Sequence, residues 1–412
     1  MAEQAIRHAS AVKPITIPVK ADVTPDNVDR VQSISGGVSQ PSEKVYEVGR
    51  LDKVCTDKGI LEQSTSITQL EYGKNDMFLQ LAGLTAEPAG GITLSDFNSS
   101  LTDIYQPGKT EYGGTVEQTL WLPKAVVDSI GIDIADAEAR IERSFELSGD
   151  KFKILKEANK YLIFKEDDAG SGVSGSHDID LSDPAPVEDP NNTGVYILQL
   201  YRIRSGVATE LELTTDYTYV SGTTTLTIID GLAGDNYRIW YSAGSYGTAG
   251  DPFVLNDTDD CFLKANSVTV LINDGTHSDV ELDLLTSLSI SATLNRINEA
   301  VVGSDEKVLK DVETTDVTVS LDGRIKDSTI EEALMGQAGQ SWGIIDPDLF
   351  GEVSVTVKIY EDSTKSSFLI GYKMTGLSFS DESRDFDANA FGTKPLSLEG
   401  TNLLITETEG NL

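Results

Sequence analysis

Histidine, cysteine and basic residues are scarce in this chain of 412 residues. It has three histidines, two cysteines and 32 lysines and arginines, against 67 aspartates and glutamates. The two cysteines, Cys55 and Cys261, are too few for a disulfide framework or for a structural zinc site of four ligands. Three histidines that lie far apart in the sequence leave little material for His-based catalysis. We therefore predict no enzymatic activity, no cofactor and an inert, apolar role for both cysteines.

Long apolar runs are also missing. No stretch approaches the ~20 apolar residues that span a bilayer, and residues 1–14 lack the apolar segment of a signal peptide. We expect no membrane insertion and no secretion by that route.

The motifs of common active sites are absent as well. The glycine-rich stretches lack the Gly-Lys-Ser/Thr ending of a phosphate-binding loop, and no Gly-x-Ser-x-Gly elbow occurs. One acidic turn contains Asp257, Asp259 and Asp260, which are candidate calcium ligands. This turn lacks the central glycine and distal glutamate of an EF-hand, so we interpret it as a solvated turn and predict no metal site.

The net charge is the most unusual property of the composition, at −35. An acidic surface repels phosphate, which argues against a protein that grips nucleic acid. It is compatible with a protein past which nucleic acid must slide. The alternative interpretation is a general adaptation to solubility or high salt, with acidic residues on every surface.

Apolar and polar residues alternate with a period of two in many segments, which predicts a mainly β protein. The clearest examples are 353–359, 130–134, 145–147, 226–228, 377–379 and 396–398. Two short helices are expected, one over 75–81 with Asp76 as N-cap and one over 327–335 with Ser328 and Glu331 as a capping box.

An internal repeat organises these segments. A shift of 254 residues lays 31–58 on 285–312 without a gap and gives 7 identities in 28 positions. The two predicted helices then match at a shift of 252, and 143–150 matches 394–401 at a shift of 251. Three matched blocks in the same order predict a duplicated unit.

A different segment separates the two copies. Residues 169–194 and 242–251 are rich in Gly, Ser, Asp and Pro and are predicted linkers. Strand-like runs at intervals of roughly ten residues fill 195–241, as in a small β-sandwich. The predicted domains are an N-terminal arm (1–14), copy 1 (15–168), the linker, an inserted module (195–241), the second linker and copy 2 (252–412).

The chain resembles the tail tube proteins of tailed viruses in the order of its predicted elements. The resemblance includes two matched segments, Arg-Ser-Phe-Glu-Leu-Ser-Gly-Asp before the insertion and Lys-Pro-Leu-Ser-Leu-Glu-Gly-Thr near the C-terminus. The chain looks like the form in which two tube domains are fused. The resemblance covers about 15–168 and 252–412, and the inserted module resembles the Ig-like decorations of such proteins. It implies two tandem β-sandwich or barrel domains, each with a short helix.

The resemblance also implies a function. Three duplicated chains would form a pseudo-hexameric ring, and stacked rings would form an acidic tube through which the viral genome passes. A long hairpin in each copy, mapped to 49–65 and 303–314, would contact the next ring. Its charged residues would be Asp52, Lys53, Asp57, Lys58, Glu306, Lys307, Lys310 and Asp311.

The implied location is the virion tail, after synthesis in the host cytoplasm. The implied partners are other copies of the chain, a tape-measure protein, tail-tip proteins and, in contractile tails, a sheath. The viral DNA would pass without specific binding.

Two alternative hypotheses remain at this stage. One is a surface or secreted glycan-binding protein, with the sugar on an aromatic face of the module and calcium at 257–260. The aromatic residues in question are Trp121, Trp240, Trp342, Tyr201, Tyr217, Tyr219, Tyr237 and Tyr241. The other is an enzyme that uses paired carboxylates, as glycosidases do. The sequence leaves open the host, the type of tail, the carboxylates that face the bore and the ligand of the module.

Overall fold

The computed structural model confirms a mainly β protein with two short α-helices among the residues it describes. These residues are 15–18, 26–39, 42–46, 53–58, 62–98, 100–109, 116–136, 138–149, 153–156, 161–169, 174–189, 193–245, 247, 263–282, 285–297, 299–300, 307–309, 311–324, 329–336, 350–382 and 393–412.

The elements of copy 1 are β1 (Ile15–Pro18), β2 (Asp26–Asn27), β3 (Val31–Ser39), β4 (Ser42–Tyr46), β5 (Lys53–Lys58), β6 (Glu62–Leu70), α1 (Asp76–Ala82), β7 (Ile92–Thr93), the 3-10 turn η2 (Leu94–Phe97), β8 (Thr102–Lys109), β9 (Val116–Ile134), β10 (Ile141–Ser148) and β11 (Lys153–Lys156). Those of the inserted module are β12 (Tyr161–Asp168), β13 (Ser174–Asp180), β14 (Ile197–Arg204), β15 (Val207–Glu210), β16 (Tyr217–Tyr219), β17 (Thr225–Leu232) and β18 (Asn236–Ala243). Those of copy 2 are η4 (Ala265–Ser267), β19 (Val268–Asn273), β20 (Val280–Glu281), β21 (Leu285–Arg296), β22 (Glu299–Ala300), β23 (Lys307–Leu309), β24 (Val312–Arg324), α2 (Thr329–Leu334), β25 (Val353–Tyr360), β26 (Phe368–Glu382), β27 (Thr393–Gly400), β28 (Asn402–Thr406) and η6 (Glu409–Asn411).

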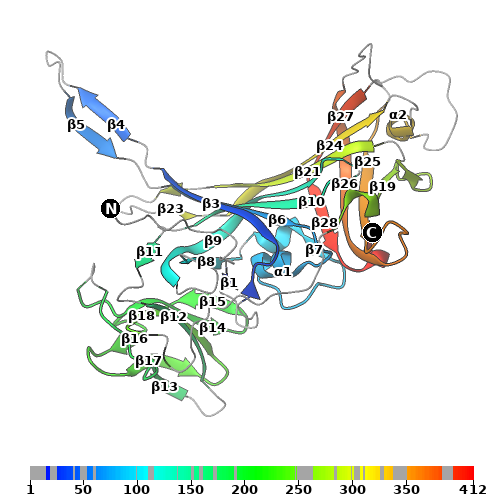
Figure 1. Ribbon diagram of the computed structural model, residues 1–412. Coiled ribbons are helices and arrows are strands. Elements are labelled where there is room, and N and C mark those ends of the chain that lie inside the picture. Colours follow the sequence, from blue (N-terminus) through cyan, green and yellow to red (C-terminus); the bar gives the residue numbers. More distant parts are fainter. Residues whose placement is uncertain are drawn as a thin grey trace.

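One antiparallel sheet runs through both copies and crosses the top of the molecule in Figure 1. Its eight strands follow the spatial order β3-β6-β10-β9-β21-β24-β27-β26. The first four strands belong to copy 1 and the last four to copy 2. We call this the long sheet.

Each copy closes its core with a second sheet, packed against the long sheet as in a sandwich. In copy 1 the order is β2-β1-β8-β9-β11, and in copy 2 it is β20-β19-β25-β26-β28, with β7 of copy 1 added at the edge. The strands β9 and β26 belong to both sheets of their copy. In β9 the change of sheet follows Lys124, whose φ is 51°.

The two copies repeat each other in strand order and in register. Ile34 pairs with Ile67 between β3 and β6, and Leu288 pairs with Leu321 between β21 and β24, at the same shift of 254 residues. The shift of 251 relates Phe145 on β10 to Leu396 on β27, and these residues pair with Ile67 and Leu321. The repeat seen in the sequence therefore corresponds to a repeated arrangement of strands.

The long sheet is open, which corrects the barrel alternative in our fold prediction. Among the described strands, β3 pairs in this sheet only with β6, and β26 pairs in it only with β27. The physical reason is the head-to-tail order of the copies, which joins the two half-sheets side by side and leaves one edge at each end.

The helix α1 covers the core of copy 1 beneath the long sheet (Figure 1). Met77, Phe78 and Leu81 of this helix are buried. The N-cap is Asn75 and not Asp76 as predicted, and Gly83 ends the helix at a φ of 64°, where a residue without Cβ is favoured. In copy 2 the helix starts at Thr329, and the predicted cap Ser328 lies outside the described residues.

The long hairpins begin earlier than predicted. In copy 1 the hairpin strands are β4 and β5, and Thr65 already lies inside β6. In copy 2 they are β22 and β23, and Thr314 lies inside β24. The alternation of polar residues around 49–65 did not mark where the hairpin ends and the long sheet resumes.

The inserted module is larger than predicted. Residues 161–168 and 174–180, assigned from the sequence to copy 1 and to a linker, form β12 and β13, which pair with β18 and β17. The module contains a four-stranded sheet, β12-β18-β14-β15, and a three-stranded sheet, β13-β17-β16, around its own core. The sequence of β13 did not predict a strand, because its composition is polar and one side of this strand faces solvent.

Candidate functional site: the polar face and the internal seam of the long sheet

The face of the long sheet that points away from α1 consists of small hydroxyl residues and carboxylates. On β10 the pattern is regular: Phe145 and Leu147 point into the core, whereas Glu142 and Glu146 are exposed. One row of neighbours crosses all eight strands on this face: Ser33, Thr68, Ser144, Gly131, Ser291, Thr318, Glu399 and Ser378. We call this surface the polar face.

Among the described side chains, six exposed carboxylates lie on the polar face: Glu142, Glu146, Asp133, Asp316, Asp381 and Glu399. Hydroxyls and amides bind several of them, as Ser289 Oγ donates to Asp133 Oδ1 at 2.5 Å and Ser380 Oγ donates to Glu399 Oε1 at 2.6 Å. Among the described side chains of the eight strands, no lysine or arginine points out of this face. The face therefore presents negative charge and neutral hydroxyls to any ligand.

The two copies meet where β9 pairs with β21, along six residue pairs from Leu288–Ile134 to Thr293–Ser129. We call this junction the internal seam. A buried arginine of copy 2 reinforces it: Arg296 donates from Nε to Val127 O at 3.0 Å and from its terminal nitrogens to Phe97 O and Asn98 O. Burial lowers the pKa of Arg296, and nearby Asp128 opposes this shift.

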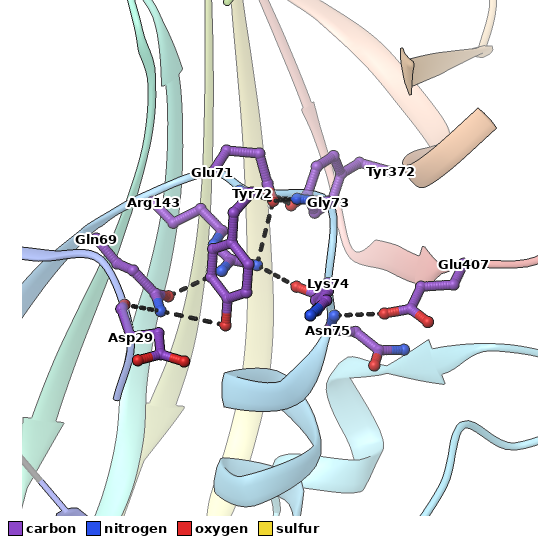
Figure 2. Close-up of polar contacts among 10 residues, drawn as sticks. All are labelled: Asp29, Gln69, Glu71, Tyr72, Gly73, Lys74, Asn75, Arg143, Tyr372 and Glu407. Atoms are coloured by element: carbon purple, nitrogen blue, oxygen red, sulfur yellow. Dashed lines mark hydrogen bonds and ion pairs between the residues drawn. The ribbon is translucent and has the colours of Figure 1, made fainter. Parts of the chain in front are cut away.

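A second buried group joins copy 1 to copy 2 at another place (Figure 2). Arg143 on β10 lies 3.5 Å from Glu71, with both side chains fully buried, and Tyr372 of copy 2 donates its hydroxyl to Glu71 Oε2. The backbone N–H groups of Tyr72 and Gly73 also donate to this carboxylate, at 2.9 and 2.8 Å.

Arg143 has further partners in copy 1. It donates to Lys74 O at 2.7 Å and to Gln69 Oε1 at 2.9 Å, and its guanidinium lies over the ring of Tyr72. Burial, the largest single effect, would lower the pKa of Arg143, but Glu71, Tyr372 and Tyr72 together outweigh it and raise the pKa above its ordinary value. A buried charge with this many partners is stabilised as an ion.

Sequence analysis missed these residues, although the pattern contained a signal. Arg143 occupies an inward position of β10, between the buried Ile141 and Phe145. An arginine at an inward position of a period-two strand requires a buried acceptor. The acceptor, Glu71, follows β6, and no local pattern identifies it.

The inserted module is docked on copy 1 through aromatic side chains. Tyr105 and Trp121 of copy 1 stack at 6.0 Å between ring centroids, and they form one buried cluster with Tyr201 and Trp240 of the module. At the rim, Lys124 Nζ lies 2.6 Å from Glu210 Oε2. Beneath the cluster, the fully buried Asp103 accepts hydrogen bonds from Trp121 Nε1, the hydroxyl of Tyr105 and the backbone N–H of Lys124.

The aromatic residues considered as a sugar-binding face lie mostly inside the protein. Tyr217, Tyr237 and Tyr241 belong to the core of the module, and Tyr219 is partly buried against it. Trp121, Tyr201 and Trp240 are buried at the docking contact, and Trp342 lies outside the described residues.

Several predicted site residues lie where the structure describes little or nothing. Asp257, Asp259, Asp260, Cys261, Asp52, Glu306 and Lys310 are outside the described residues. Lys53, Cys55, Asp57 and Lys58 are on β5 and Lys307 is on β23, whereas Asp311 is exposed just before β24. The role expected for these mixed charges, contact between the hairpin and the next ring, therefore stays a prediction.

In the described part of the chain, no group of three or more His, Cys, Asp or Glu residues is arranged to hold a metal ion. Neither of the described helices is long and apolar enough to cross a membrane.

Comparison with known proteins assigns no family to this chain. No protein-family model matches the chain, and no curated protein matches it. Among solved structures, a chain of the anti-feeding prophage baseplate, determined by cryo-EM with six-fold symmetrisation, has a TM-score of 0.28 at 12% identity. The match covers 38% of this chain and 98% of that one. A TM-score of this size does not establish a shared fold.

Proposed function

We propose that this protein is the tail tube subunit of a tailed virus, a structural component of the virion without catalytic activity. Three chains form a ring of six copies, and stacked rings form the tube through which the genome passes. The proposal follows the resemblance in element order and duplication, and one structural observation supports it above the others.

That observation is the internal seam. The last strand of the copy 1 half-sheet, β9, pairs with the first strand of the copy 2 half-sheet, β21. The same two kinds of edge remain at the two ends of the long sheet, because β3 corresponds to β21 and β26 corresponds to β9. A contact of this head-to-tail kind repeats, and it gives a ring when the rotation closes.

Ring closure also removes a hazard. Unpaired strand edges are templates for uncontrolled pairing with other chains. If β26 of one chain pairs with β3 of the next, three chains of eight strands each form one closed sheet with no free edge. The curvature of such a ring places one face of the long sheet around a central channel.

The polar face is the surface that suits this channel. DNA carries one negative charge per ~1.7 Å of duplex, and lysine or arginine side chains would bind its phosphates. Carboxylates repel the phosphates, and small hydroxyls give only neutral contacts. The composition of the polar face thus supports passage without binding.

The inserted module would lie outside the tube. It docks on the sheet that contains β8 and β9, in the layer of the sandwich opposite the polar face. One module per chain gives three projections per ring. A tape-measure protein and tail-tip proteins are the expected assembly partners, and a sheath would contact the same outer surface.

Electron microscopy of the concentrated, purified protein in negative stain, with and without added salt, tests the proposal. We expect rings or stacked tubes with a central hole and three peripheral projections per ring. Sedimentation should show trimers, or multiples of three, that form from monomers as the concentration rises. Closed particles of another symmetry, or monomers at every concentration and salt level, would contradict the proposal.

A further inference from the structure

The internal seam ends at a contact made by one arginine. Pairing between β9 and β21 stops at Ser129 and Thr293. Further along β21, Arg296 reaches back across the seam and donates from Nε to Val127 O at 3.0 Å. The side chain of Arg296 is buried, and Asp128 Oδ1 lies 3.6 Å from the same Nε. This contact, which we call the arginine clamp, joins the two half-sheets where the backbone pairing has ended.

The position of copy 1 that is equivalent to Arg296 is occupied by a serine. Arg296 pairs with Val312 between β21 and β24, and Ser42 pairs with Lys58 between β4 and β5. The two pairs are related by the shift of 254 residues that also relates β3 to β21. The strand β4 therefore continues the repeat, and Ser42 stands in copy 1 where the arginine stands in copy 2.

The carboxylate of the clamp also differs between the copies. Asp128 forms a bulge in the pairing of β9 with β10, and Ser380 forms the equivalent bulge in the pairing of β26 with β27. In copy 1, Ser148 Oγ donates to Asp128 Oδ1 at 3.0 Å. In copy 2, Ser380 Oγ donates to Glu399 Oε1 at 2.6 Å. The hydroxyl and the carboxylate have exchanged places, so the bulge of β26 carries no charge to face an arginine.

We infer that the contact between neighbouring chains is the internal seam without its arginine clamp, and is therefore the weaker and reversible seam of the ring. This inference rests on the proposed ring, in which β26 of one chain pairs with β3 of the next. At that seam, Ser42 of the next chain takes the place of Arg296. The carbonyl equivalent to Val127 O is that of Phe379, and a serine is too short to make the contact that an arginine makes there.

Unequal seams suit a ring that assembles from separate chains. The guanidinium of Arg296 donates to three backbone carbonyls of copy 1, and hydrogen bonds from a charged donor are stronger than those between neutral groups. The contact between chains lacks these bonds, so it dissociates more readily than the internal seam opens. Chains that meet in a wrong arrangement can then separate before a ring closes.

The variant Ser42→Arg transfers the clamp to the contact between chains. We expect its dissociation constant for chain association, measured by sedimentation, to fall at least about tenfold, because charged hydrogen bonds form across that seam. The matched control is Thr218→Arg, which makes the same change of charge at an exposed position of the module and should leave association unchanged. Equal association of the two variants would overturn the inference.

The reciprocal variant Arg296→Ser removes the clamp from the internal seam. We expect hydrogen exchange of the backbone N–H groups of β9 that face β21, within residues 129–134, to become at least about tenfold faster. Unchanged exchange would show that the arginine does not hold the seam and would also contradict the inference. If wild-type chains form rings and Ser42→Arg associates no more tightly, only this inference fails. If wild-type chains never associate, the proposed function fails with it.

Discussion

Asp103 is a carboxylate without access to solvent, at the base of the contact between copy 1 and the module. Burial raises the pKa of Asp103 from 3.8 to about 6, against the opposing effect of the hydrogen bonds donated by Lys124, Trp121 and Tyr105. The folded protein thus binds this proton more tightly than the unfolded chain does. The stabilisation from protonation is complete below pH 3.8 and is lost as the pH rises through about 6.

The variant Asp103→Asn removes this titration. A shift of about two pKa units corresponds to roughly 3 kcal/mol. Between pH 4 and pH 7, we therefore expect the free energy of unfolding of the wild type to fall by roughly 3 kcal/mol more than that of the variant. Urea denaturation followed by tryptophan fluorescence measures it, since Trp121 and Trp240 lie in the same cluster. Parallel pH profiles of the two proteins would contradict the assignment.

Tyr372 connects the two copies through a single hydroxyl, which donates to the buried Glu71. Removing one partner from a buried, charged acceptor costs about 1–3 kcal/mol. We expect Tyr372→Phe to lower the free energy of unfolding by this amount and to increase hydrogen exchange at the N–H groups of Tyr72 and Gly73, which donate to the same carboxylate. Tyr360→Phe, on β25 and outside this network, is the control. If both variants are equally stable, the network does not hold the copies together.

The inserted module illustrates how an element is positioned by packing and not by its linkers. The composition of the segments on either side of the module predicts flexible linkers. The structure nevertheless gives the module a buried aromatic cluster that it shares with copy 1. The side chains that form it, Trp121 and Trp240, come from strands whose local pattern gives no indication of a partner. Docking fixes the orientation of the module relative to the long sheet.

The aromatic cluster, and not the surface ion pair, should carry the docking energy. Truncating a buried tryptophan costs about 3–5 kcal/mol, whereas an exposed ion pair contributes about 0–1 kcal/mol. We expect Trp121→Ala to expose residues 161–243 to limited proteolysis at their junctions with copy 1, with the core of the module still folded. Lys124→Ala, which removes only the pair with Glu210, should change little. A larger effect of Lys124→Ala would reverse this ranking.

Passage of DNA without binding, as we propose it, depends on how charge is distributed over the whole molecule. The double variant Glu142→Lys with Glu146→Lys places two cations per chain on the polar face, where both carboxylates are exposed. In assembled rings we expect this variant to bind short duplex DNA, with log K falling by about 0.9 per phosphate contact for each unit of log[salt]. Fluorescence anisotropy provides the measurement.

The control carries the same change of net charge on the module, as Glu212→Lys with Asp230→Lys, both exposed in the structure. Wild type and control should not retain DNA. If the control binds DNA as tightly as the polar-face variant, net charge alone explains the effect, and the polar face has no special role.

The amino-acid sequence by itself determined the class of the fold, the duplication and the acidity. Each of these is a local or additive property. The alternation in β10 and β25 follows from which side of a strand meets the core, and the repeat is visible because equivalent strands need equivalent patterns. The serines and carboxylates of β10 could be assigned to an outward face for the same reason.

Only the tertiary structure decided which strands are neighbours. The pairing of β9 with β21 joins residues more than 150 positions apart, and the partners of Arg143 and Asp103 come from separate elements. The burial of Ile405 on β28 depends on β7 of copy 1, which pairs alongside it. Long-range pairing depends on the packing of the entire chain, and no local pattern encodes it.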